Sequence, residues 1–153
     1  MSGLKIEFEI EGEKQVSLAL EDVEVKIVNF APPLKKVRKY LLKIWQLNFQ
    51  TNGKLLGKPW KKLKPATVKR KKGKGGILRD SGDMVRSFSG TVLKDSLVMK
   101  NSADQFAFHQ SKQPRKSNLP RRIMMRINEQ ARQRILEIFN GYVNKIIPRN
   151  LKK

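Results

Sequence analysis

Apolar side chains recur at spacings of three and four between residues 33 and 49, and this pattern constrains the fold more than any other. The set is Leu34, Val37, Leu41, Ile44, Trp45 and Phe49. Because an α-helix has 3.6 residues per turn, these side chains share one face of a helix about 25 Å long. Lysines and arginines fill most of the opposite face. The chain must therefore bury one face of this helix, with Trp45 as the expected core anchor.

A second helix is predicted over residues 129–147. Asn128 precedes it as a plausible N-cap, and Pro148 is expected to end it. Its apolar face is made of Ala131, Ile135, Ile138, Phe139, Tyr142, Val143 and Ile146.

Strands are expected in several shorter segments. Residues 4–11 alternate apolar and charged side chains, which is typical of a half-buried strand. Residues 16–28 fit either a strand or a short helix. Residues 88–93 and 96–100 predict a hairpin that turns at Lys94 and Asp95, and residues 122–127 read as a further strand.

A turn into a short helix is expected over residues 77–88 and a short helical turn over 103–110, with long loops over 51–76 and 111–118. Together these elements predict an α+β fold. One small, mainly antiparallel sheet would pack against the two long amphipathic helices, with the long basic loop at 51–76. Residues 1–153 are expected to form a single domain, with 51–76 as an extended loop or arm.

The charge is strongly unbalanced. The 153 residues carry a net charge of +21, and residues 25–79 contain half of the 34 lysines and arginines but no acidic residue. Such a chain repels itself and is best accommodated beside a polyanion or an acidic protein surface. The charge therefore narrows the class of partner before any motif is considered.

Several chemistries find no support in the residues present. The chain has no cysteine and its only histidine is His109, so thiol catalysis and histidine-rich or cysteine-based metal sites are excluded. Asp80, Asp83 and Asp104 lack the density of a calcium loop, and residues 73–76 lack the spacing of a P-loop. We expect no cofactor, no metal and no enzymatic activity. A hydrolase that uses Ser81 or His109 is the weakest hypothesis, because capping by Asp80 and Ser81 explains that segment.

No apolar run is long enough for a membrane span, and the first residues lack the apolar segment of a secretory signal. We therefore expect a protein made and used inside a cell, with no membrane partner.

The loop at 51–76 is the sharpest functional candidate. It combines dense lysine with glycine clusters and one tryptophan, Trp60. Three interpretations are open: a nucleic-acid contact in which Trp60 stacks on bases, a contact with an acidic protein, or a solvated loop. Residues 69–72 also resemble a nuclear localisation signal, which is a weak pattern by itself.

Four motifs, in order, resemble the phage virion morphogenesis family, whose members are also called phage tail completion proteins. The first runs from Gly57 through Pro59, Trp60, Leu63 and Pro65 to Lys71. The others are Ile77-Leu78-x-Asp80-Ser81-Gly82, then Phe106-Ala107-x-His109-Gln110, then Leu119-Pro120-x-Arg122. The resemblance covers most of the chain from residue 33 onward.

This resemblance implies a non-enzymatic structural protein of a phage or prophage, placed in the virion at the head–tail junction and in the host cytoplasm during assembly. Its implied partners are other neck, connector or tail proteins and further copies of itself in a ring, often a hexamer, with DNA nearby in the channel. A basic protein that acts directly on duplex DNA remains the alternative.

Two groups of residues are singled out on these grounds. The expected partner contacts are Trp60, Lys61, Lys62, Leu63, Lys69, Arg70, Lys71, Lys72, Arg115 and Lys116. The expected structural motif residues are Asp80, Ser81, Gly82, His109 and Arg122.

Overall fold

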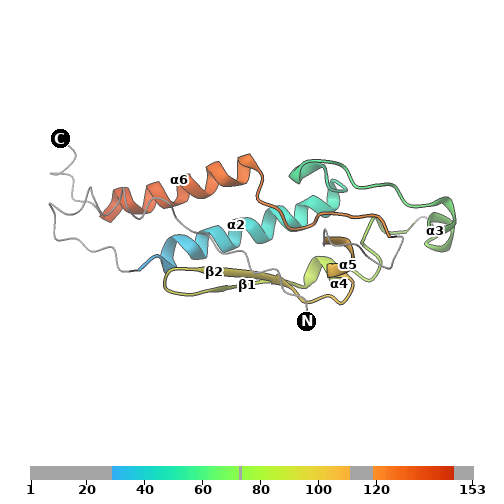
Figure 1. Cartoon of the computed structure of the whole chain (residues 1–153), viewed down its shortest axis with the longest axis horizontal. Helices are drawn as coiled ribbons and strands as arrows, with labels where there is room; N and C mark the ends of the chain where they lie inside the picture. Colours follow the sequence, from blue (N-terminus) through green and yellow to red (C-terminus); the bar gives the residue numbers. More distant parts are fainter. Residues whose placement is uncertain (1–28, 73, 111–118, 147–153) are drawn as a thin grey trace.

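Helix α2 (Ala31–Gln50) lies at the centre of the fold in the computed structural model, which describes residues 29–72, 74–110 and 119–146. Helix α6 (Glu129–Ile146) runs along one side of α2, and the hairpin of β1 (Phe88–Val92) and β2 (Leu97–Asn101) runs along the other (Figure 1). The two helices are antiparallel, and the hydroxyl of Tyr142 near the end of α6 donates to the carbonyl of Asn29, 2.8 Å away, just before α2. The described residues therefore form an α+β fold with a two-stranded antiparallel sheet.

The predicted helix over 33–49 is confirmed, with a few more residues at its ends. Pro32 and Pro33 occupy its first turn, where a missing N–H leaves no intrahelical hydrogen bond unmade. Its apolar stripe forms the centre of the core, and five of its residues are at most 1% exposed: Leu34, Val37, Leu41, Trp45 and Phe49. Asn48 is buried in the same stripe.

The predicted hairpin is also confirmed. Its strands pair in the register Phe88↔Asn101 to Val92↔Leu97, and the N–H of Leu93 donates to the carbonyl of Ser96 across the Lys94-Asp95 turn at 2.8 Å. Phe88, Leu97 and Met99 are buried. The ring of Phe88 contacts Trp45 and Phe49 of α2, with centroids 5.8 and 5.9 Å apart. Aromatic contacts thus join the sheet to the central helix.

Asn128 caps α6 as predicted, because its Oδ1 accepts from the N–H of Ala131 at 2.9 Å. Only Ala131 and Ile135 of this helix are buried, whereas Ile138 and Phe139 are partly exposed. The short helices α4 (Asp83–Arg86) and α5 (Phe106–Gln110) occupy the two segments where helical turns were expected.

Two expectations are wrong. Residues 122–127 form no strand, because their backbone groups bond to side chains of other elements instead of a neighbouring strand. Residues 51–76 are not one irregular loop, since they contain the 3₁₀ helix η1 (Lys54–Leu56) and the helix α3 (Pro65–Arg70). Pro65 at the start of α3 fixes a helical φ, which favours helix initiation there.

Other expectations lie outside the described residues. These are the strand at 4–11, the segment at 16–28, the loop at 111–118 with Arg115 and Lys116, and the stop at Pro148.

Candidate functional site

The candidate site is the basic arm, which we define as residues 57–72 and 74–76, together with the surface at its base. The arm departs at Gly57, whose φ of 138° and ψ of −104° suit only glycine. It extends beyond the carboxyl end of α2, and α3 lies at its far end (Figure 1). None of the six residues of α3 is buried. The cations of α3, Lys69 and Arg70, are thus presented away from the core.

Trp60 fastens the base of the arm to the core. Its side chain is 6% exposed and packs edge-on against Phe49, with ring centroids 5.1 Å apart. Its Nε1 donates to the carbonyl of Ile123 at 2.9 Å, and its backbone N–H donates to Asn52 at 2.7 Å. Gly53, at φ 89°, lies so close that any side chain there would overlap the indole. Trp60 is therefore part of the core, and its ring is not displayed for stacking on bases.

The segment at 119–128 is held by the side-chain amide of Gln110. Its Oε1 accepts from the backbone N–H of Met124 at 2.7 Å and of Met125 at 3.1 Å, and its Nε2 donates to the carbonyl of Met125 at 2.7 Å. One glutamine thus replaces a strand partner, because buried backbone groups need hydrogen bonds from some source. Both methionine side chains are buried as a result.

His109 and Arg122 connect the same segment to α5 and to the arm. The Nδ1 of His109 lies 3.2 Å from the carbonyl of Pro120, and the N–H of Arg122 donates to the carbonyl of His109 at 2.9 Å. The Nη2 of Arg122 donates to the carbonyl of Lys61 at 3.0 Å. Arg122 is 5% exposed, and burial lowers the pKa of its guanidinium below the ordinary value. Two of the resemblance motifs therefore meet at the base of the arm.

Asp80, Ser81 and Gly82 lead into α4. Gly82 adopts the left-handed φ of 84° just before the helix, and the hydroxyl of Ser81 donates to Asp83 Oδ2 and accepts from the N–H of Asp83. The bond from Ser81, and then the one from Arg86, lower the pKa of Asp83 below its ordinary value. The expected capping by Asp80 and Ser81 is wrong, because Gly82 occupies the N-cap position and makes no side-chain cap. The Ser81 hydroxyl is engaged by Asp83 instead, and Asp80 lies beside Lys71.

The side chain of Lys71 contacts the residues by which the arm returns to the core, and it does not face solvent. Its side chain is 9% exposed, its Nζ donates to the carbonyl of Gly76 at 3.1 Å, and it lies 3.6 Å from the carboxylate of Asp80. By contrast, Lys61, Lys62, Lys69, Arg70 and Lys72 are exposed, and Leu63 is partly buried against the core. Of the expected contact residues, these five cations are therefore available at the surface.

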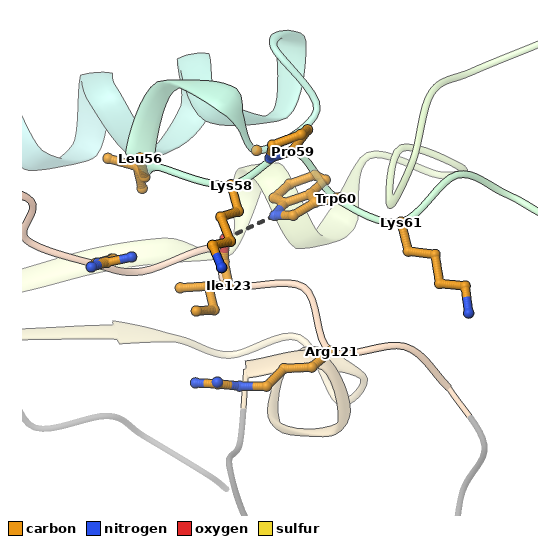
Figure 2. Close-up of a pocket in the computed structure, with 9 residues that line it drawn as sticks. Leu56, Lys58, Pro59, Trp60, Lys61, Arg121 and Ile123 are labelled. Atoms are coloured by element: carbon orange, nitrogen blue, oxygen red, sulfur yellow. Dashed lines mark hydrogen bonds between the residues drawn. The ribbon is translucent and has the colours of Figure 1, made fainter.

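A concavity of about 350 Å³ opens beside the base of the arm. Its walls include Leu56, Pro59, Trp60 and Ile123 (Figure 2). Among the described residues, four cations line it and no acidic residue does; the cations are Lys58, Lys61, Arg121 and Arg126. No described carboxylate forms an ion pair with any of the four. The concavity, which we call the cationic concavity, thus combines apolar walls with cations that no described carboxylate pairs.

Sequence reasoning did not single out Lys58, Arg121, Arg126 or Asn48, and it named Gln110 only as the last residue of a resemblance motif. Asn48 also carried a usable signal, because an amide inside an apolar helical stripe must find buried hydrogen-bond partners. Its Oδ1 accepts from the N–H of Leu56 at 3.2 Å, and its Nδ2 donates to the carbonyl of Ile123 at 3.5 Å. These bonds fix the positions of Leu56 and Ile123, which form two walls of the cationic concavity.

Within the described ranges, no helix is long and apolar enough to cross a membrane, and no three histidine, cysteine or acidic residues cluster as metal ligands would.

Comparison with known proteins gives one match. The family model described as "Phage virion morphogenesis family" matches residues 12–144. No curated protein and no solved structure matches the chain.

Proposed function

The chain belongs to the phage virion morphogenesis family, and on that premise we propose that it completes the phage tail and joins it to the head. Family membership itself gives the protein a structural or assembly role in a virion, and it indicates a structural protein rather than an enzyme. The proposal adds the place, which is the head–tail junction, and the partners, which are neck, connector or tail proteins and further copies of the chain in a ring.

The observation that carries this proposal is the basic arm. The arm is fastened to the core at Trp60, and none of the residues of α3 is buried, which leaves α3 exposed for contact with a partner. Exposed Lys62, Lys69 and Arg70 offer charge to an acidic partner face, and such charges act mainly on the rate and specificity of association. We therefore propose the arm as the surface that docks on a neighbouring virion protein.

Direct binding to duplex DNA is the second candidate, because the arm contains no acidic residue. The burial of Trp60 removes its ring as a stacking platform for unpaired bases. Contacts with backbone phosphates would then carry any DNA affinity. DNA in the channel of the proposed ring is compatible with either function.

Charge reversal on the arm tests the proposal in the phage or prophage that carries the gene. Lys62→Glu, Lys69→Glu and Arg70→Glu combined should leave the protein folded and produce separate heads and tails, counted by electron microscopy. The matched control reverses three exposed lysines on α2, Lys35, Lys36 and Lys39, with the same change in net charge. Normal joining in the arm variant would overturn the proposal, and defects of equal size in both would reduce it to an effect of total charge.

A further inference from the structure

The cationic concavity presents four positive side chains over an apolar floor, and no described carboxylate neutralises them. In Figure 2 the side chain of Lys58 lies beside Trp60 and extends towards Ile123, and Arg121 lies below Ile123 in the view. A volume of about 350 Å³ lies at the lower end of ligand-binding sites. The ligand that fits this chemistry is a short peptide segment with both carboxylates and apolar side chains.

Such a segment exists in the chain itself. More than half of its 13 acidic residues fall in the first 24 positions, against two lysines there. Within that stretch Ile6, Phe8 and Ile10 alternate with Glu7, Glu9 and Glu11. In an extended segment, alternate side chains face opposite sides. The apolar set would then meet the floor of the concavity, and the glutamates would meet the long basic side chains around it.

We propose that the cationic concavity of one copy receives residues 4–11 of a second copy. This inference rests on the proposed function for its premise that copies of the chain assemble. A chain with net charge +21 repels its copies, so association needs a local pairing of opposite charges.

Residue 29, where the described body begins, lies beside the start of α2, whereas the concavity lies beyond the other end of this 20-residue helix, about 30 Å away. The 17 residues between positions 11 and 29 span about 56 Å when extended, so residues 4–11 have the length to reach the concavity of their own copy or of a second copy. The second copy is the proposed occupant because the proposed function requires copies to associate. A donor and an acceptor on different copies give a head-to-tail contact, which closes into a ring when the rotation between copies allows it.

A charge-swap experiment with full-length protein tests the contact. One variant carries Lys58→Glu, Arg121→Glu and Arg126→Glu, which changes the summed charge of the four lining positions from +4 to −2. The other carries Glu7→Lys and Glu9→Lys, which reverses the segment. The control carries Lys35→Glu, Lys36→Glu and Lys39→Glu on the exposed face of α2, with the same charge change as the first variant. Analytical ultracentrifugation at low and high salt measures the mass of the species in solution.

The natural chain and the control should associate, and salt should weaken the association. Each reversed variant alone should dissociate, with an apparent dissociation constant raised at least about tenfold, because like charges then meet at the contact. An equimolar mixture of the two variants should associate again, since each negative concavity then finds a positive segment and each positive concavity a negative one.

Four results would overturn the inference. The first three are a monomeric natural chain, reversed variants that assemble normally, and a control that dissociates as much as they do. The fourth is a mixture of the two variants that stays monomeric, because the segment then binds within its own copy or elsewhere. A loss of duplex DNA affinity in the concavity variant without a change in mass would identify a phosphate site instead. The proposed function is tested by a separate readout, which is head–tail joining in the combined Lys62→Glu, Lys69→Glu and Arg70→Glu variant, and that variant leaves the concavity charges unchanged.

Discussion

The indole Nε1 of Trp60 lies 2.9 Å from the carbonyl oxygen of Ile123, which joins the base of the basic arm to a segment 63 residues further along the chain. The same carbonyl also accepts from Nδ2 of Asn48 at 3.5 Å. One carbonyl thus holds the central helix, the arm and the 119–128 segment in register. The cationic concavity exists because these three parts are held together.

Substitution of Trp60 should therefore affect stability before it affects assembly. Trp60→Ala should lower the free energy of unfolding by about 3–5 kcal/mol, because it removes a buried aromatic side chain. Trp60→Phe keeps most of the packing and should lose about 1–3 kcal/mol with the hydrogen bond. Urea unfolding followed by circular dichroism measures both, with exposed Lys62→Ala as a control expected within about 0.5 kcal/mol of the natural protein. Full stability of Trp60→Ala would mean that the ring is not a core residue.

Gln110 should matter more than its partial exposure indicates. Gln110→Leu leaves the N–H groups of Met124 and Met125 without their acceptor, at a cost of about 1–3 kcal/mol per buried group left unpaired. Hydrogen exchange at these two amides should accelerate, while exchange at Ala131, capped by Asn128, should change less. Unchanged protection of the Met124 and Met125 amides would contradict the conclusion that Gln110 holds the segment at 119–128.

The carboxyl group of Asp83 should titrate below its ordinary pKa of 3.8. Its lowered pKa in the folded state means that it contributes stability above the unfolded-state pKa, and that this contribution is lost as pH falls through the folded-state pKa. Ser81→Ala should raise the pKa of Asp83 towards the ordinary value, because the bond from Ser81 is the largest single cause, and Arg86→Gln should also raise it, because the hydrogen bond and the charge of Arg86 both lower it. Carboxyl ¹³C titration by NMR measures each value. An unchanged pKa in Ser81→Ala would exclude the hydroxyl as the cause.

Limited trypsin digestion should cut different parts of residues 51–76 at different rates, although the sequence alone predicts one loop there. Within residues 51–76, cleavage should come first at Lys69, Arg70 and Lys72, since α3 buries no residue. Lys54 should resist longer because η1 packs against α2 and Trp60 packs against Phe49. Mass spectrometry of the early fragments identifies the sites. Early cleavage at Lys54 would show that η1 is not held against the core.

Duplex DNA binding separates the two functions proposed for the arm. An assembly protein should bind DNA weakly and without saturation. A DNA-binding protein should bind tightly. The logarithm of its association constant should fall against the logarithm of salt concentration, with a slope of about 0.9 for each phosphate neutralised. In that case the combined reversal of Lys62, Lys69 and Arg70 should reduce the slope by about 3. Fluorescence anisotropy over a salt series measures the slope.

The sequence by itself determined the elements whose signals are local. The stripe from Leu34 to Phe49 predicts α2 because helical periodicity requires no knowledge of what the helix packs against. Asn128 predicts the start of α6 in the same way, since an N-cap bonds only within its own first turn. The ordered motifs also identified the family, which the match over residues 12–144 supports.

Only the tertiary structure decided the conformation of residues 119–128 and the place of Trp60. The segment at 122–127 has the composition of a strand, but side chains distant in sequence supply its hydrogen bonds, so it needs no strand partner. Trp60 lies in a glycine- and lysine-rich stretch that suggests exposure, yet Gly53 and Phe49 make room for it in the core. Such contacts depend on long-range closeness that local patterns do not encode, and they create the cationic concavity from residues of two distant segments.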